Sequence, residues 1–197
     1  MNKLVIIGAG GHGKVAADIA ELNGYSEIVF LDDNVKNSKV VGNISDYLKY
    51  VKKCDFFVGI GNNRVRKNMF DMLNDAGANI VSLIHPKATI SRTATLGTGV
   101  IVMHGALVGV DAVVGDGAIV NTCASVDHDC SLGEFSHISA GVHMAGTMKI
   151  DSFTFVGVGA TVIQNICSDC IIGAGAVVSR PINESGTYVG VPARKIK

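Results

Sequence analysis

The chain has 197 residues, 24 glycines, 3 prolines, no tryptophan and a formal net charge of zero. Its length predicts one or two domains, and a neutral chain lacks the basic surplus that nucleic-acid binding requires. The longest apolar runs, such as residues 4–7, are far shorter than the ~18 residues of a membrane span, and no basic segment precedes a long apolar stretch as in a signal peptide. We therefore expect a cytoplasmic protein without a membrane span.

The first 80 residues alternate short apolar strands with helices. The expected elements are strands at 3–7, 28–31, 55–60 and 79–84, and helices at 14–23 and 64–75. Such alternation predicts a parallel sheet with helical crossovers. Pro86 stops the last strand, so we expect the domain to end near His85-Pro86.

A glycine motif lies between the first strand and the first helix. Residues 8–13, Gly-Ala-Gly-Gly-His-Gly, match G-x-G-x-x-G, whose glycines let the backbone approach a diphosphate at a helix N-terminus. Asp32, 19 residues after Gly13, fits a carboxylate placed for ribose hydroxyls. The domain is about half of a paired dinucleotide fold, which favours one nucleotide, and a second turn at Gly61 opens on the same crevice. The alternative is that the glycines only make a tight turn.

From residue 84 onward an aliphatic side chain recurs at every sixth position and, after one shortened unit, resumes at residue 166. A six-residue period is typical of parallel β-helices, and small residues crowd the next position, which suggests that they ease the corners. We therefore predict an α/β Rossmann-like half domain over 1–84, followed by a left-handed parallel β-helix over 85–197. The inward positions are Ile84, Ile90, Leu96, Val102, Val108, Val114, Val120, Val126, Leu132, Ile138, Met144, Ile150, Val156, Val162, Ile166, Ile172 and Val178.

Five cysteines are an odd number without framework spacing, so cytosolic free thiols are the simplest interpretation. Cys167 and Cys170 have the C-x-x-C spacing of a metal or redox pair and lie in the shortened unit. One such pair without a second is a weak signal.

Four of the six histidines fall within one 40-residue stretch of the predicted β-helix, whose narrow aliphatic interior excludes them: His104, His128, His137 and His143. Asp127-His128-Asp129 is the most polar point of the repeat, and a carboxylate beside an imidazole holds one tautomer and raises its basicity. This pattern predicts a general base; the alternative is an exposed surface histidine. Three hexads make one coil, so Gly146, 18 residues on, lies one coil above His128, and its N–H is a candidate oxyanion donor.

Several segments together resemble the sialic acid O-acetyltransferase-like (NeuD/PglD-like) group of bacterial nucleotide-sugar acetyltransferases. The resemblance spans the chain and implies acetyl-CoA-dependent N-acetylation of a nucleotide-linked amino sugar, first a UDP-4-amino-4,6-dideoxy sugar, for glycan biosynthesis. It also implies a homotrimer with acetyl-CoA between adjacent β-helices and no metal. The segments are the hexapeptide run and residues 8–13, 30–33, 59–63, 121–122, 127–130, 133–137 and 189–193.

The resemblance also implies roles for single positions. His128 falls on the general base, Asp129 on the acid that strengthens it, and His137 on a histidine at the thioester end of acetyl-CoA. Val158 and Ala174 fall on the pantetheine channel, with Ala174 where some relatives have glycine. The nucleotide-sugar contacts fall on Gly10, Gly11, His12, Asp32, Asp33 and Gly61.

Three other functions stay open. One is O-acetylation of a sialic-acid-type sugar. Another is a γ-carbonic-anhydrase-like zinc enzyme with His104, His137 and His143 as ligands, although that family separates its paired histidines by four residues and His137 and His143 are separated by five. The third is a non-enzymatic dinucleotide sensor fused to an oligomerising β-helix. The base of the nucleotide, UDP, GDP or CMP, is not determined by the sequence.

Overall fold

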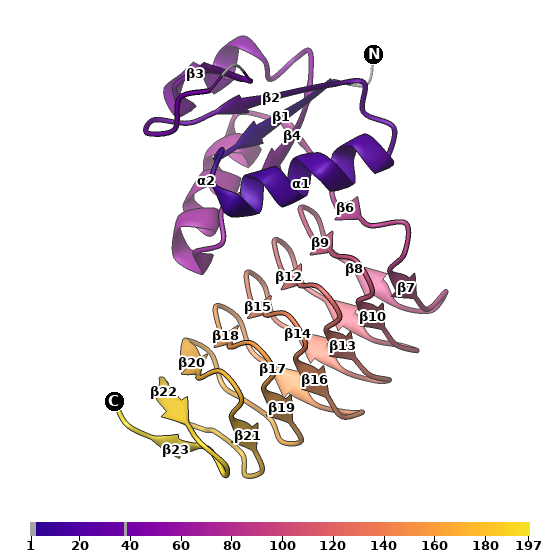
Figure 1. The fold of residues 1–197 in the computed structure, drawn as a ribbon, viewed down its shortest axis with the longest axis vertical. Helices are drawn as coiled ribbons and strands as arrows, with labels where there is room; N and C mark the ends of the chain where they lie inside the picture. Colours follow the sequence, from indigo (N-terminus) through magenta and orange to yellow (C-terminus); the bar gives the residue numbers. More distant parts are fainter. Residues whose placement is uncertain (1–2, 38) are drawn as a thin grey trace. The chain divides into compact units, whose positions relative to one another are not determined.

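The computed structural model describes residues 3–37 and 39–197 and divides the chain into two compact units, Met1–Pro86 and Lys87–Lys197 (Figure 1). The sequence analysis placed this boundary two residues earlier, and its assignment of one ligand to each unit remains a prediction. No helix in the described ranges is long and apolar enough to cross a membrane.

The first unit is a five-stranded parallel sheet with helical crossovers, as predicted. The strand order is β3-β2-β1-β4-β5. Its elements are β1 (Lys3–Ile7), α1 (Gly11–Leu22), β2 (Glu27–Leu31), β3 (Val40–Gly42), the 3₁₀ helix η1 (Ile44–Lys49), β4 (Asp55–Val58), α2 (Asn63–Asp75), β5 (Asn79–Ile80) and β6 (Leu83–Ile84).

The core of this unit sits on the central strands, because strands covered on both faces need continuous apolar sequence. Residues 4–7 of β1 are fully buried, and β4 supplies Phe56 and Phe57. From α1, Ala16, Ile19 and Ala20 are buried at helical spacing.

Three local expectations were wrong in detail. Helix α1 begins at Gly11, inside the glycine motif, because Gly10 is extended and serves as its N-cap. Strand β3 and helix η1 were not expected, since residues 33–54 have no clear periodicity. The strand expected over 79–84 is two short strands, β5 and β6.

The second unit is a left-handed parallel β-helix of short strands, as predicted (Figure 1). Its three faces are the β7 sheet (β7, β10, β13, β16, β19, β21), the β8 sheet (β8, β11, β14, β17) and the β9 sheet, to which this unit contributes β9, β12, β15, β18, β20, β22 and β23. The strands are β7 (Thr89–Ile90), β8 (Thr95–Leu96), β9 (Ile101–Val102), β10 (Leu107–Val108), β11 (Val113–Val114), β12 (Ile119–Val120), β13 (Ser125–Val126), β14 (Ser131–Leu132), β15 (His137–Ile138), β16 (His143–Met144), β17 (Lys149–Ile150), β18 (Phe155–Val156), β19 (Thr161–Val162), β20 (Cys170–Ile172), β21 (Val177–Val178), β22 (Gly186–Val189) and β23 (Arg194–Lys195).

Residues 18 apart pair from coil to coil, and residues 16 apart pair across the shortened unit, so the aliphatic side chains stack inside. Val108, Val126 and Met144 pair in sequence along β10, β13 and β16, and all three are buried. From residue 102 onward, every inward position named above is buried. The predicted register of the repeat is therefore confirmed.

The corners are made differently from the expectation. From Leu96 to Ile172, a left-handed residue lies three positions after every inward aliphatic except Val162, whereas the small residue directly after the aliphatic does not have a left-handed φ. Gly133 is small for another reason, because a Cβ there would lie 2.3 Å from the backbone N of Ser152 on the next coil. The left-handed corner residues are Gly99, Gly105, Asp111, Gly117, Cys123, Asp129, Phe135, Gly141, Thr147, Phe153, Gly159, Asp169 and Gly175.

Candidate functional site

The first unit has a cleft of about 370 Å³ at the carboxyl ends of its strands. Strand order reverses between β1 and β4, and such a switch point is where open α/β sheets bind ligands. All six residues predicted from the sequence line this cleft: Gly10, Gly11, His12, Asp32, Asp33 and Gly61. The structure therefore brings them together, while their ligand remains a prediction.

Glycines shape this cleft in two ways. A Cβ on Gly13 would lie 2.0 Å from the carbonyl oxygen of Gly8, so Gly13 lets α1 pack closely against the turn after β1. At Gly10, Gly11 and Gly61 a Cβ would meet nothing within 4 Å, so this backbone is open to a ligand. Helices α1 and α2 both begin at this edge, where their first N–H groups and positive dipole ends favour an anion.

The neighbouring carboxylates of Asp32 and Asp33 accept different numbers of hydrogen bonds. Asp32 accepts the backbone N–H groups of Ala9, Asn34 and Val35 at 2.7, 2.8 and 2.7 Å. Burial alone would raise the pKa of Asp32, but these three donors outweigh it and hold that pKa below its ordinary value. Asp32 thus fixes the glycine turn. Asp33 accepts a hydrogen bond from Ile44 N through one oxygen, so its carboxylate keeps more capacity for ligand hydroxyls.

Arg66 supports this cleft from beneath its lining, a role that the sequence analysis missed. Its side chain is 1 % exposed, and its guanidinium donates to the carbonyl oxygens of Ile60 and Gly61 and to Asn63 Oδ1 at 2.9–3.1 Å. Burial lowers the pKa of Arg66 to about 9, so it stays charged at neutral pH. Burial and, second, the Arg66 charge lower the pKa of His12 to about 4. The cleft thus carries a neutral imidazole backed by a buried cation.

In the second unit, His128 lies at the corner between the β7 and β8 sheets. Its Nδ1 is 2.7 Å from Asp129 Oδ2, and its backbone N–H donates to Asp127 Oδ1. Asp129 takes the left-handed corner conformation (φ 57°), which aspartate tolerates better than most residues. The bond to Asp129 and the charges of Asp127 and Asp129 raise the pKa of His128, whose side chain is 55 % exposed.

Gly146 lies on the next coil directly against the imidazole, as the 18-residue spacing predicted. A Cβ on Gly146 would lie 2.3 Å from Nε2, 2.5 Å from Cε1 and 2.8 Å from Cδ2 of His128. Thr147 N donates to His128 O at 2.8 Å and fixes the two coils in this register. Within the described ranges, the N–H of Gly146 donates to no protein acceptor.

His137 lies on another face, the β9 sheet, and is 8 % exposed. Its Nε2 is 3.2 Å from Asn121 Nδ2, and its ring meets the edge of Phe155 at a centroid distance of 5.1 Å. Within one chain, His137 therefore lies on the β9 face, whereas His128 lies at the corner between the other two faces.

Val158 and Ala174 are both exposed and stack on adjacent coils at the corner between the β9 and β7 sheets. Gly175 N donates to Val158 O at 2.8 Å, which keeps the two coils in register. The outward face of the β7 sheet separates this corner from that of His128. His143 on this face contacts Ser125 Oγ through Nδ1 at 2.8 Å.

His104, by contrast, is exposed at the corner after β9. The three histidines considered as zinc ligands therefore occupy a corner and two different faces. Across residues 3–37 and 39–197 there is no group of three or more His, Cys, Asp or Glu side chains that could hold a metal ion.

Comparison with known proteins identifies the family. Residues 3–73 match the family model described as the PglD N-terminal domain. The chain is 28 % identical to the GDP-perosamine N-acetyltransferase of Escherichia coli O157:H7, over 100 % of this chain and 97 % of that protein.

Two solved structures match the whole fold. The acetyltransferase domain of PglB from Neisseria gonorrhoeae FA1090, in complex with acetyl coenzyme A, is 42 % identical with a TM-score of 0.95 over 100 % of both chains. A histidine-to-asparagine mutant of perosamine N-acetyltransferase from Caulobacter crescentus, in complex with CoA and GDP-perosamine, is 36 % identical with a TM-score of 0.96, over 100 % of this chain and 98 % of that chain. With this identity over its full length, the chain belongs to the PglD-like family of nucleotide-sugar acetyltransferases.

Proposed function

We propose that this protein transfers the acetyl group of acetyl-CoA to the amine of a nucleotide-linked amino sugar, with a UDP-linked 4-amino-4,6-dideoxy sugar as the first candidate. The observation that carries the proposal is the contact between His128, Asp129 and Gly146. It places a polarised imidazole and an unengaged backbone N–H side by side on adjacent coils.

His128 is the proposed general base. Because the Asp129 carboxylate can only accept, the neutral imidazole carries its hydrogen on Nδ1 and presents Nε2 as the acceptor. An amine can attack a thioester only when it is unprotonated, so Nε2 takes up the proton that the amine loses as the bond forms. Asp127 and Asp129 stabilise the imidazolium that results.

Gly146 is the proposed oxyanion donor. Attack on the thioester places negative charge on its oxygen, and a preorganised N–H lowers the energy of that charge. Glycine is required here because any side chain would collide with the imidazole. The base and the donor thus use adjacent coils of one stack.

The cleft of the first unit is the proposed nucleotide-sugar site. Its glycines, the first N–H groups of α1 and the Arg66 charge together favour a diphosphate, while Asp33 offers an acceptor for hydroxyls. Binding energy from the nucleotide would hold the amine in line with the thioester.

A homotrimer is the proposed assembly, with acetyl-CoA held between adjacent β-helices by His137, Val158 and Ala174. The separation of His137, on the β9 face, from His128, at the corner between the other two faces, supports a site completed by a second subunit. A native mass measurement tests this part, and a monomer that turns over acetyl-CoA would contradict it.

The substrate is tested with the purified protein, acetyl-CoA and a panel of UDP-, GDP- and CMP-linked amino and hydroxy sugars, with thiol release as the readout. We expect release only with acceptors that carry a free amine. Release with a hydroxyl acceptor alone would favour O-acetylation, and tight NADH binding without thiol release would favour the sensor.

A further inference from the structure

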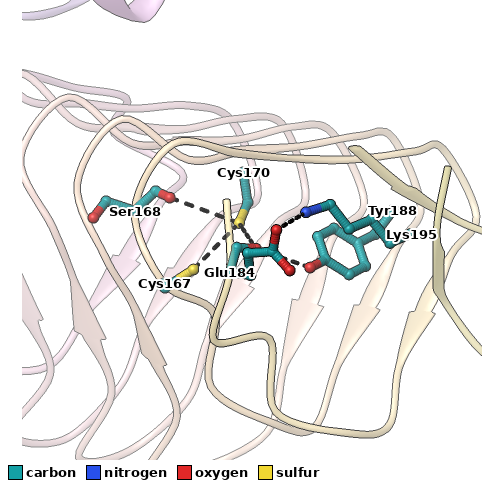
Figure 2. Close-up of polar contacts among 6 residues, drawn as sticks. All are labelled: Cys167, Ser168, Cys170, Glu184, Tyr188 and Lys195. Atoms are coloured by element: carbon teal, nitrogen blue, oxygen red, sulfur yellow. Dashed lines mark hydrogen bonds and ion pairs between the residues drawn. The ribbon is translucent and has the colours of Figure 1, made fainter. Parts of the chain in front are cut away.

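Two thiols meet at a single turn of the β-helix, the turn that leads into β20 (Cys170–Ile172). Cys167 and Cys170 form the only C-x-x-C sequence of the chain. Their Sγ atoms lie 3.6 Å apart, in contact but not bonded (Figure 2). Both belong to the shortened unit, where the six-residue period is interrupted.

The backbone of this turn already has the spacing that a disulfide needs. Ser168 and Asp169 form the turn, so the cysteines are its first and last residues, whose Cα atoms lie within about 7 Å. Disulfides span roughly 4.4–6.8 Å between Cα atoms. The hydroxyl of Thr154 bonds to both ends of the turn: it donates to Cys167 O at 2.9 Å and accepts from Cys170 N at 3.3 Å.

The two thiols differ in access to solvent. Cys170 is 1 % exposed, and its Sγ lies 3.7 Å from the carbonyl oxygens of Ser168 and Glu184. Burial and, second, the contact with Cys167 raise the pKa of the Cys170 thiol to about 12. Cys167 is half-buried. A reagent from solvent therefore reaches Cys167 first.

We propose that Cys167 and Cys170 form a dithiol site that a low-molecular-weight disulfide, RSSR, reversibly oxidises to an intramolecular disulfide. The Cys167 thiolate attacks one sulfur of RSSR, the S–S bond of the reagent breaks, and one RSH leaves after taking up a proton. Cys170 then loses its proton and attacks the Cys167 sulfur, and a second RSH leaves. The protein dithiol gives up two electrons and two protons, and RSSR becomes two RSH.

The surroundings should tolerate this oxidation without unfolding. The Tyr188 hydroxyl donates to Glu184 O, and Lys195 pairs with the Glu184 carboxylate (Figure 2). These contacts connect β22 and β23 to the segment beside Cys170. To form the disulfide, the sulfur atoms must approach from 3.6 Å to ~2.05 Å. The fold should therefore survive both redox states.

The test uses the full chain, reduced, freed of reductant and incubated with oxidised glutathione, followed by acid quenching, thiol alkylation and trypsin. Peptide 150–194 contains both cysteines and no other. We expect most of this peptide to lose two hydrogens and to escape alkylation, and to regain both thiols after dithiothreitol, with an unchanged circular dichroism spectrum.

Variants test the order of the two steps. Cys170→Ser should trap a glutathione adduct on Cys167, whereas Cys167→Ser should form several-fold less adduct because Cys170 is buried. Cys123→Ser, which removes an exposed thiol elsewhere, should leave the oxidation unchanged. The proposal is overturned if peptide 150–194 of the native chain keeps two alkylatable thiols while Cys123 forms an adduct. It is equally overturned if Cys167 bonds only to a cysteine of another chain.

Discussion

Replacing Gly146 with alanine should remove the proposed base from its position without unfolding the protein. The new Cβ would lie 2.3 Å from His128 Nε2, well inside the ~3 Å at which carbon and nitrogen atoms repel, so the imidazole must swing away. Stability should change little, because Gly146 does not have a left-handed φ and the atom that must move ends an exposed side chain.

The size of the effect follows from the rate enhancement that a general base contributes. Displacing it should lower kcat by about 10²- to 10⁴-fold, the range that such catalysis supplies. Steady-state kinetics with acetyl-CoA and the accepted sugar measure kcat, and thermal unfolding checks the fold. A folded Gly146→Ala protein within about threefold of native kcat would refute the geometric argument.

A double mutant distinguishes two explanations for the loss of kcat in Gly146→Ala. If alanine acts through His128, then His128→Ala with Gly146→Ala should be no slower than His128→Ala alone. A further large loss in the double mutant would show that the Cβ blocks the acetyl group itself.

Three further predictions concern the base, the stack and the cleft. Asp129→Asn should lower the pKa of His128, because the native carboxylate raises it. The acid limb of the plot of kcat/KM against pH should therefore move to lower pH. An unmoved limb would contradict the pairing of His128 with Asp129. Ile138→Ala should lower the free energy of unfolding by about 2–5 kcal/mol in a denaturant titration, since Ile138 is fully buried in the stack, and an unchanged midpoint would mean a different register. Arg66→Met should weaken nucleotide-sugar binding by about tenfold in calorimetry, because the turn at Gly61 loses its hydrogen-bond donors and the cleft loses a nearby cation. Acetyl-CoA affinity is the internal control. An equal loss for both ligands would indicate general misfolding.

The stack was predictable from sequence because a β-helix repeats one local rule. Its period fixes both which side chains point inward and which residues meet on adjacent coils, so the 18-residue spacing placed Gly146 beside His128. The corners were harder. The small residue after each aliphatic suggested an easier turn at the corner. In the structure, a small residue is needed there because the backbone of the next coil lies too close for a Cβ.

The cleft was predictable only in outline. The glycine motif and the strand ends located it, because parallel strands finish at one edge of a sheet. Arg66 reads in the sequence like any cation on an exposed helix face, and only the fold shows it buried under the turn at Gly61. The bonds of Asp32 to three backbone N–H groups depend likewise on where the neighbouring loop returns, which no local pattern encodes.

Single-turnover kinetics of His128→Ala show whether His128 is the general base of acetyl transfer. With the native assembly intact and both substrates saturating, we expect a rate of acetyl transfer about 10²- to 10⁴-fold below native, with unchanged acetyl-CoA affinity. A variant that binds both substrates and transfers acetyl at the native rate would contradict it.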